Sequence, residues 1–282
     1  MIVHRFIDVG GTRLHVAEQG SGPPVVLLHG FPEFWFSWRA QMDALAAAGF
    51  RAVAPDLRGY NESDKPRGTG SYRASLVADD VAGVIRSLDA GLVPVVGHDW
   101  GAPIAYRLAM DHPELVSRLF ILNGPHPEHF RKLLWKSAAQ RRRSWYIFLF
   151  QLPLLPERAL RRPGTLARIF RRMATRPEVF GDEVIAEYER AFARPGALHA
   201  AVSYYRAARL PDRRPRGGVT CPTLVLWGMK DSALGPECLE GLDRYVPDVR
   251  IHRIEGASHW VQQEAADEVN AVLLRELGAS GS

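Results

Sequence analysis

The sequence predicts an α/β fold, a mostly parallel sheet with helices on both faces and an inserted helical lid. Short apolar runs alternate with helical patterns along most of the chain, which is typical of a parallel sheet whose crossovers are helices. From about residue 127 to 218 the strand signals stop, and helical segments separated by Pro and Gly replace them. We therefore expect residues 1–126 and 219–282 to form one core and residues 127–218 to form the lid.

The first part of the chain should build one half of the sheet. Residues 2–9 and 12–18 alternate apolar and polar residues around Gly10-Gly11, which predicts a β-hairpin and hence an antiparallel edge. Beyond it, continuous apolar runs predict buried parallel strands, and helical periodicity predicts the crossovers. The predicted strands are residues 25–28 and 51–54, and the predicted helices are residues 37–48 and 72–88.

The remaining elements complete the sheet on either side of the lid. A strand that begins at Val93 runs into the sharp sequence Gly97-His98-Asp99-Trp100-Gly101, and a helix follows at once. The other predicted elements are strands over residues 115–122, 223–227 and 249–254 and a final helix over residues 261–277. Residues 278–282 are predicted to be a frayed tail.

Composition and charge narrow the class of protein. The 282 residues are 46% hydrophobic and 24% charged, with a net charge of +5, which is ordinary for a globular protein. Arginine clusters such as residues 141–143 alternate with apolar residues at helical spacing, so we interpret them as solvated helix faces and expect no nucleic-acid partner. The two cysteines lack the spacing of a disulfide framework or a metal site. Without a signal-peptide core or an apolar run of membrane length, we expect a cytoplasmic protein with no membrane span.

The turn after the strand at Val93 has the layout of a nucleophile elbow with Asp99 at its centre. Such a turn exposes one side chain at the end of a strand, and Gly97 and Gly101 let the backbone pack closely around it. The helix directly behind favours an anion, so Asp99 should be an ionised carboxylate at neutral pH. Taken alone, Asp99 is better explained as a helix cap, and the elbow glycines together with its partners favour the nucleophile.

Asp231 and His259 also follow predicted strands, so both should reach the carboxyl edge of the sheet beside Asp99. Nucleophile, acid, histidine is the chain order of a hydrolase triad. In such a set Asp99 attacks an electrophilic carbon to form an ester, and His259 activates the water that hydrolyses it. Asp231 would fix the tautomer of His259. Singly, Asp231 fits a helix cap and His259 a structural histidine, but three matched positions favour the triad.

Hydrolysis of the ester needs donors for the charge that develops on oxygen. The backbone N–H of Trp100 directly follows the nucleophile, and the turn at Gly30-Phe31 can supply the backbone N–H of Phe31. An ordinary tight turn is the alternative interpretation of this second segment. His29 and His98 flank the expected site, and we interpret them as supports of backbone geometry rather than as proton carriers.

Six segments resemble those of the epoxide hydrolases of the α/β-hydrolase family, and together they span nearly the whole chain. They are residues 29–32, 58–66, 97–101, 123–127, 227–231 and 256–260. The aspartate-centred elbow and Phe31-Pro32 are the more specific of these pieces. The resemblance implies an α/β-hydrolase fold and an enzyme that opens epoxides with no cofactor and no metal.

The resemblance also implies two lid tyrosines that hydrogen-bond the epoxide oxygen. The segment 203–206 resembles the family's lid motif and points to Tyr205 rather than Tyr204, although the family often has Asn where Ser203 stands. The segment 145–151 points in the same way to Tyr146. A phenol can donate to, and protonate, the alkoxide that ring opening leaves. The alternative is that both tyrosines only pack, as we expect of the neighbouring aromatic residues Trp145, Phe148 and Phe150.

The leading interpretation is an epoxide hydrolase that makes vicinal diols through a covalent ester on Asp99. A dehalogenase uses the same attacking aspartate, and Trp100 could serve a halide, whereas Phe31 and the tyrosine pair favour an epoxide. A relative that binds ligands without turnover is a third interpretation, although such proteins usually lose members of the triad.

The substrate should be a small apolar or aromatic epoxide, with water as the second reactant. This follows from the aromatic and apolar side chains near the expected site. The predicted pocket wall consists of Phe31, Trp35, Trp38, Trp100, Phe148 and Leu149. We expect the protein to be a monomer or a homodimer.

Overall fold

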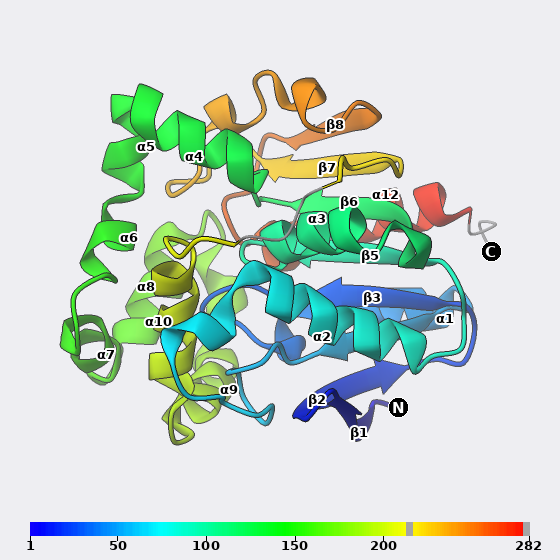
Figure 1. The fold of residues 1–282 in the computed structure, drawn as a ribbon, viewed down its shortest axis with the longest axis horizontal. Coiled ribbons are helices and arrows are strands. Elements are labelled where there is room, and N and C mark those ends of the chain that lie inside the picture. Colours follow the sequence, from blue (N-terminus) through cyan, green and yellow to red (C-terminus); the bar gives the residue numbers. More distant parts are fainter. Residues whose placement is uncertain (213–216, 279–282) are drawn as a thin grey trace.

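The computed structural model describes residues 1–212 and 217–278 of the chain. Within these residues one eight-stranded sheet has the order β1-β2-β4-β3-β5-β6-β7-β8 (Figure 1). The strands are β1 (Val3–Val9), β2 (Thr12–Gln19), β3 (Pro24–Leu28), β4 (Arg51–Pro55), β5 (Val93–His98), β6 (Val116–Leu122), β7 (Thr223–Gly228) and β8 (Val249–Ile254). The predicted α/β-hydrolase fold is confirmed.

The sheet is parallel except at one edge. β1 pairs with β2 in antiparallel register, because the Gly10-Gly11 turn reverses the chain within two residues, as the hairpin pattern predicts. β2 also pairs with β4 in antiparallel register. From β4 to β8 the neighbouring strands run parallel. Their carboxyl ends therefore meet along a single edge, where α/β proteins place their ligands.

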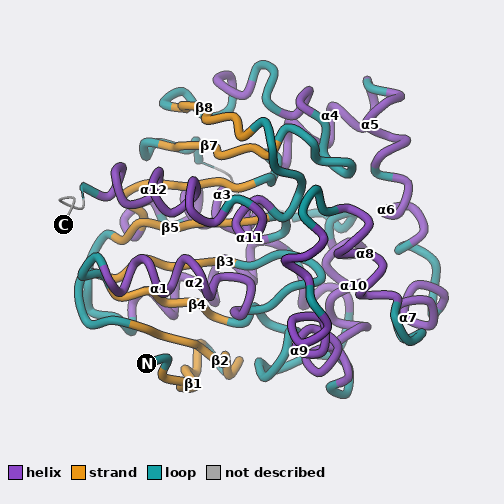
Figure 2. The backbone as a smooth tube through the Cα atoms, turned by 180° about the vertical axis from the view of Figure 1, so that it is seen from behind, coloured by secondary structure: helices purple, strands orange, loops and turns teal. Residues whose placement is uncertain are grey.

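Helices cover both faces of the sheet, and each face has its own apolar core. α2 (Ala74–Arg86) and α3 (Gly101–Asp111) lie on the face toward the viewer in Figure 1. α1 (Arg39–Ala47), α11 (Val261–Glu264) and α12 (Ala266–Leu277) lie on the opposite face, seen in front in Figure 2. Most strand positions are buried because a parallel sheet covered on both faces leaves them no contact with water.

Three predicted helices differ in detail from those in the structure. The helix predicted over residues 37–48 begins as a 3-10 turn, Trp35–Trp38, before α1, and another 3-10 turn, Thr69–Tyr72, precedes α2. The single helix predicted over residues 261–277 is broken at Ala265 (φ −120°, ψ 42°). Gln262, Gln263 and Glu264 are all buried with polar partners. Because consecutive side chains of a helix point in different directions, the burial of all three means that protein surrounds this turn on several sides. Hydrophobic periodicity identifies a helix with one apolar face, so it cannot reveal the partners of these polar side chains.

The chain between β6 and β7 is helical, and it covers the carboxyl edge of the sheet (Figures 1 and 2). Its α-helices are α4 (Pro127–Lys136), α5 (Ala138–Arg143), α6 (Trp145–Leu149), α7 (Leu155–Leu160), α8 (Thr165–Met173), α9 (Asp182–Ala193) and α10 (Ala197–Ala207). Residues 213–216 of the predicted lid and residues 279–282 of the predicted tail lie outside the described residues. Across the described ranges, the helices are too short or too polar to traverse a bilayer.

Candidate active site

The turn between β5 and α3 holds Asp99 in a left-handed backbone conformation, with φ at +47°. Aspartate tolerates this region better than most residues, but the conformation still costs free energy. The flanking glycines are required by close contacts. A Cβ atom on Gly97 would lie 2.5 Å from the carbonyl oxygen of Gly101, and one on Gly101 would lie 2.0 Å from that of Leu28. The elbow therefore forms only where these side chains are absent.

The two carboxylate oxygens of Asp99 have different surroundings. Oδ1 accepts a hydrogen bond of 2.7 Å from the backbone N–H of Phe31, whereas Oδ2 lies 3.5 Å from Nε2 of His259. Gly30 makes this approach possible, because a Cβ atom there would lie 2.5 Å from Oδ1. The hydrogen bonds found among the described residues include none from the Trp100 N–H to this carboxylate. One oxygen is thus held by the backbone and the other faces the base.

His29 holds the loop that presents the Phe31 N–H. Its Nδ1 donates to the carbonyl of Gly30 at 2.9 Å, and its Nε2 accepts from the N–H of Leu57 at 3.0 Å. These partners fix the neutral tautomer, and burial lowers the pKa of His29 below its usual value. His29 is therefore a buried, neutral side chain that links two loops through its hydrogen bonds.

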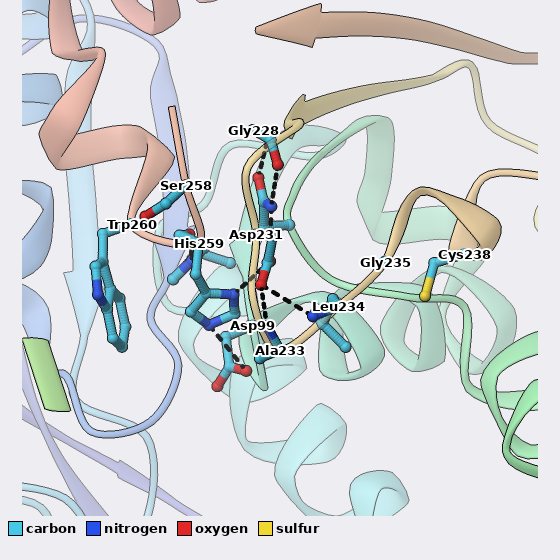
Figure 3. A network of polar contacts seen from close by, with 12 residues as sticks. Asp99, Gly228, Asp231, Ala233, Leu234, Gly235, Cys238, Ser258, His259 and Trp260 are labelled. Carbon is cyan, nitrogen blue, oxygen red and sulfur yellow. Dashed lines mark hydrogen bonds and ion pairs between the residues drawn. The ribbon is translucent and has the colours of Figure 1, made fainter. Parts of the chain in front are cut away.

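Asp231 and His259 meet beside Asp99 at the carboxyl ends of β7 and β8 (Figure 3). Nδ1 of His259 donates to Oδ2 of Asp231 at 2.7 Å. Oδ1 of Asp231 accepts from the backbone N–H groups of Ala233 and Leu234, at 2.7 and 2.9 Å. Both oxygens of the Asp231 carboxylate are therefore held by hydrogen bonds.

The pairing shifts both pKa values in the direction of an ion pair. Burial opposes ionisation of Asp231, but the charge of His259 and the hydrogen bonds to the carboxylate outweigh burial and hold the pKa of Asp231 below its usual value. Burial likewise opposes protonation of His259, but Asp231 and then Asp99 outweigh it and raise the pKa of His259 well above its usual value. The two carboxylates therefore favour the cationic form of the imidazole between them.

Asn123, predicted only as part of the segment 123–127, is a positioning residue. It follows β6, is fully buried, and donates from Nδ2 to Oδ2 of Asp231 at 2.8 Å. Its Oδ1 accepts from the N–H of Gly228 at 2.7 Å. Because Asn123 joins the ends of two strands, it helps to orient Asp231 at the same oxygen that His259 contacts. A polar residue at the end of a buried strand was the available signal.

A second buried hydrogen-bond network, centred on His98, contacts the main chain of His259. His98 contacts the carbonyl oxygen of His259 through Nε2 at 2.8 Å and Glu33 through Nδ1 at 2.7 Å. Glu33 also accepts from Gln262 and Gln263, both at 2.9 Å. Since a carbonyl oxygen only accepts, Nε2 of His98 carries a proton. His98 therefore contacts the main chain of the base and does not face the cavity.

Glu264 ties the loop that carries His259 to the helical insertion. Its carboxylate accepts from the N–H and hydroxyl of Ser258, at 2.8 and 2.7 Å. It also accepts from the N–H and hydroxyl of Thr175, at 3.1 and 2.7 Å. Glu264 is only 2% exposed, so solvent does not compete for these bonds.

Tyr146 and Tyr205 both line the cavity that reaches Asp99, and their ring centroids are 6.0 Å apart. Burial and then the charge of Asp99 raise the pKa of each phenol, so both keep their protons at neutral pH. Tyr204 is placed differently, since its hydroxyl donates to the carbonyl of Arg58 at 2.8 Å. The hydrogen-bonding capacity of Tyr204 is therefore used inside the protein.

The cavity above Asp99 has a volume of about 710 Å³ and a largely apolar wall. Trp100 and Tyr146 line it together with Asp99, and α4 contributes Phe130, Leu134 and Trp135. Among the described residues the structure shows no cluster of side chains suited to a metal ion.

Much of the predicted pocket wall lies elsewhere. Trp38 is fully buried in the core beneath α1, and Trp35 packs against that core. Phe148 is 56% exposed, and Leu149 is absent from the cavity wall. Trp145, expected to pack, is also exposed, whereas Phe150 is buried. For Phe148 and Leu149 the reason is the orientation of α6 about its own axis. Tyr146 and Ile147 face the cavity, so the neighbouring positions on this helix face away from it.

Comparison with known proteins places the chain among proteins of the α/β-hydrolase fold. The α/β-hydrolase fold family matches residues 23–266. The chain is 38% identical over 278 residues to AB hydrolase superfamily protein YfhM of Bacillus subtilis, covering 97% of each chain. It is 36% identical over 279 residues to epoxide hydrolase 2 of Caenorhabditis elegans, covering 96% of this chain and 78% of the relative. A crystal structure of a mutant epoxide hydrolase from Bacillus megaterium with its naphthyloxy-propanediol product has a TM-score of 0.87 at 32% identity, covering 97% of this chain and all (100%) of that chain.

Proposed function

The chain belongs to the epoxide hydrolases of the α/β-hydrolase family, and we propose that it makes vicinal diols in two steps through an alkyl ester on Asp99. The observation that supports this most is the division of labour between the two oxygens of Asp99. Oδ1 is held by the Phe31 N–H, and Oδ2 faces a histidine that a second carboxylate orients. We further propose that residues 127–218 are the lid over a core of residues 1–126 and 219–282.

In the first step, Oδ2 of Asp99 attacks an epoxide carbon and the carbon–oxygen bond of the ring breaks. The alkoxide left behind takes a proton from the pair of Tyr146 and Tyr205, which line the same cavity as Asp99. Loss of the charge on Asp99 removes one of the two carboxylates that stabilise His259 as a cation. The proton that His259 then releases restores the tyrosine.

In the second step, neutral His259 removes a proton from water, and the water oxygen attacks the carbonyl carbon of the ester. The negative charge that develops falls on Oδ1, where the Phe31 N–H already donates. The bond between the carbonyl carbon and Oδ2 breaks, and the leaving alkoxide takes the remaining proton of the water from the new carboxyl group of Asp99, so the diol leaves with the original Oδ2. One water and one epoxide are consumed, and Asp99 and the protonated His259 are regenerated.

We propose a small apolar or aromatic epoxide as the substrate. The cavity wall includes Trp100, Phe130 and Leu134, and apolar walls favour apolar ligands. The similar Bacillus megaterium enzyme was crystallised with a product that carries a naphthyl group. The dehalogenase and ligand-binding interpretations are not favoured, because family membership and the two phenols beside Asp99 fit an epoxide oxygen that needs a proton donor.

A single turnover in oxygen-18 water tests the covalent step. We expect the label in the Asp99 carboxylate and unlabelled oxygen in the diol, because the diol takes its second oxygen from Oδ2. Mass spectrometry of the peptide that contains Asp99 measures the label, and Asp99→Asn is the control that should take up none. Label found only in the diol would mean that water attacks the epoxide directly and that Asp99 acts as a base.

The two steps should also differ in their response to pH. Hydrolysis of the ester should slow as pH falls, because protonated His259 cannot accept a proton from water. The apparent pKa of ester hydrolysis should lie below the pKa of His259 in the free enzyme. The charge of Asp99 raises the pKa of His259 in the free enzyme, and this charge is lost in the ester. Single-turnover rates across pH and NMR titration of the imidazole measure the two values. An identical pKa in both states would contradict this coupling.

A further inference from the structure

The outer part of the helical insertion carries an unusual charge imbalance. Residues 131–172, here called the basic flank, contain twelve Lys or Arg residues and one acidic residue, Glu157, in a chain of net charge +5. Glu157 is itself bound by Arg206 at 2.7 Å. Within the described residues, only Arg143 and Arg171 of the twelve form ion pairs with acidic side chains. The flank is therefore a strongly positive surface without internal compensation.

Large apolar side chains are exposed on the same flank. The described part of the chain has ten exposed large hydrophobic residues, and six of them fall within residues 135–155. They are Trp135, Trp145, Phe148, Leu152, Leu154 and Leu155. Trp135 is 83% exposed and Trp145 is 62% exposed. Such a concentration of exposed apolar side chains marks an interaction surface.

The helix α6 shows how this surface is built. Tyr146 and Ile147 line the cavity, whereas Trp145 and Phe148 are exposed. Residues three apart share a side of a helix, so Trp145 and Phe148 form one outward face. The helix is thus apolar toward the cavity and apolar toward solvent. Packing inside this chain explains only the first of these two faces.

The basic flank lies at the periphery of the molecule and reaches the mouth of the cavity. α5, α6 and α7 run along the outer edge, away from the sheet, in both views (Figures 1 and 2). Arg131, Leu134 and Trp135 of α4 belong to the flank and also line the cavity that ends at Asp99. A partner seated on the flank would therefore adjoin the route to the nucleophile.

We propose that the basic flank docks on the surface of an anionic lipid bilayer. Aromatic and leucine side chains that insert at the headgroup level, surrounded by arginines that attract anionic lipids, are the features by which proteins lie on a membrane without crossing it. A second copy of the chain fits less well, because a two-fold interface would bring the same positive surface against itself. A nucleic acid would satisfy the charges but leave the apolar side chains without partners.

The docked orientation places the cavity mouth at the membrane. An apolar epoxide partitions into the bilayer. Because Trp135 and Asp99 line the same cavity, the epoxide could pass from the bilayer to Asp99 without crossing bulk water. This consequence rests on the proposed function, whereas the docking itself does not. Vesicle binding without substrate and turnover of a water-soluble epoxide without vesicles therefore separate the two proposals.

Vesicle flotation tests the docking. We expect the protein to float with vesicles of phosphatidylcholine and phosphatidylglycerol in equal parts, to bind pure phosphatidylcholine far more weakly, and to dissociate at about 1 M salt, where charges are screened beyond about 3 Å. Arg141→Gln with Arg142→Gln should weaken binding about 25-fold, from roughly fivefold for each arginine. Trp145→Ser with Phe148→Ser should weaken it by at least about tenfold.

Matched controls keep the test specific. Leu92→Ser removes an exposed apolar side chain and Arg253→Gln an exposed arginine outside the flank, and both should bind vesicles as the wild type does. All variants should retain turnover of a water-soluble epoxide, which shows that they fold. Failure to bind anionic vesicles, or equal losses in control and flank variants, would overturn the proposal. So would concentration-dependent self-association that Trp145→Ser with Phe148→Ser abolishes, because the flank would then be a contact between copies.

Discussion

His259→Gln is expected to stop the enzyme after the first covalent step, with the substrate bound as an ester on Asp99. Attack by a carboxylate needs no base, but hydrolysis of the ester does, and loss of a general base typically slows a step by roughly 10²–10⁴-fold. The structure places no second imidazole to take over, because His98 contacts the main chain of His259 and His29 is held between two loops. Intact-protein mass spectrometry should show a mass gain equal to one epoxide.

Two further variants show whether the adduct has the expected origin. Peptide mapping should place the added mass on the segment that contains Asp99, and His259→Gln combined with Asp99→Asn should gain no mass. Asp231→Asn keeps the shape of the acid but removes its charge, so it should slow hydrolysis and lower the pKa of His259 while the ester still forms. Steady turnover by His259→Gln without any adduct would contradict covalent catalysis.

Tyr146→Phe combined with Tyr205→Phe is expected to slow formation of the ester more than either single change. Removal of one donor to a developing oxyanion typically costs ~2.7–4 kcal/mol, or about 10²–10³ in rate. Each single variant should lose less than this, because the remaining phenol still reaches the oxygen, whereas the double variant leaves the alkoxide without a donor from the lid. Rapid quenching followed by mass spectrometry of the Asp99 peptide measures the rate of this step directly.

Tyr204→Phe is the matched control for the tyrosine pair. It removes the same hydroxyl group from the adjacent position, but that hydroxyl donates to the carbonyl of Arg58 rather than toward Asp99. We expect a loss of stability of about 1 kcal/mol, typical of one hydrogen bond, with an almost unchanged rate of ester formation. Equal rates for the wild type and the double variant would remove Tyr146 and Tyr205 from the mechanism.

The sequence predicts the parts of the site that depend on local rules. Asp99, Asp231 and His259 each follow a parallel strand, and parallel strands bring their carboxyl ends to one edge whatever the rest of the chain does. Gly97 and Gly101 likewise predict a tight turn from the local sequence alone. For this reason the sheet and the meeting of these three side chains could be predicted without knowledge of the packing.

The pocket wall depends on how short helices rotate, which local pattern does not fix. Tyr146 and Phe148 are two positions apart on α6, yet one lines the cavity and the other is exposed. Both faces of that helix are apolar, so hydrophobic periodicity cannot predict which face lies toward the cavity. The positioning role of Asn123 and the break at Ala265 were missed for a related reason, since each depends on partners distant in the sequence.

The carboxylate of Glu264 is an acceptor shared by the helical insertion and by the loop that carries His259. Thr175 and Ser258 both donate to it, so a movement of the chain at Thr175 would disturb the position of His259. α4 and α6 line the cavity, and among the described residues the hydrogen bonds to Glu264 include none from these two helices. We therefore expect the proposed lid to open at α4 and α6, near Trp135 and Tyr146, while Thr175 remains bound to Glu264 and His259 keeps its orientation.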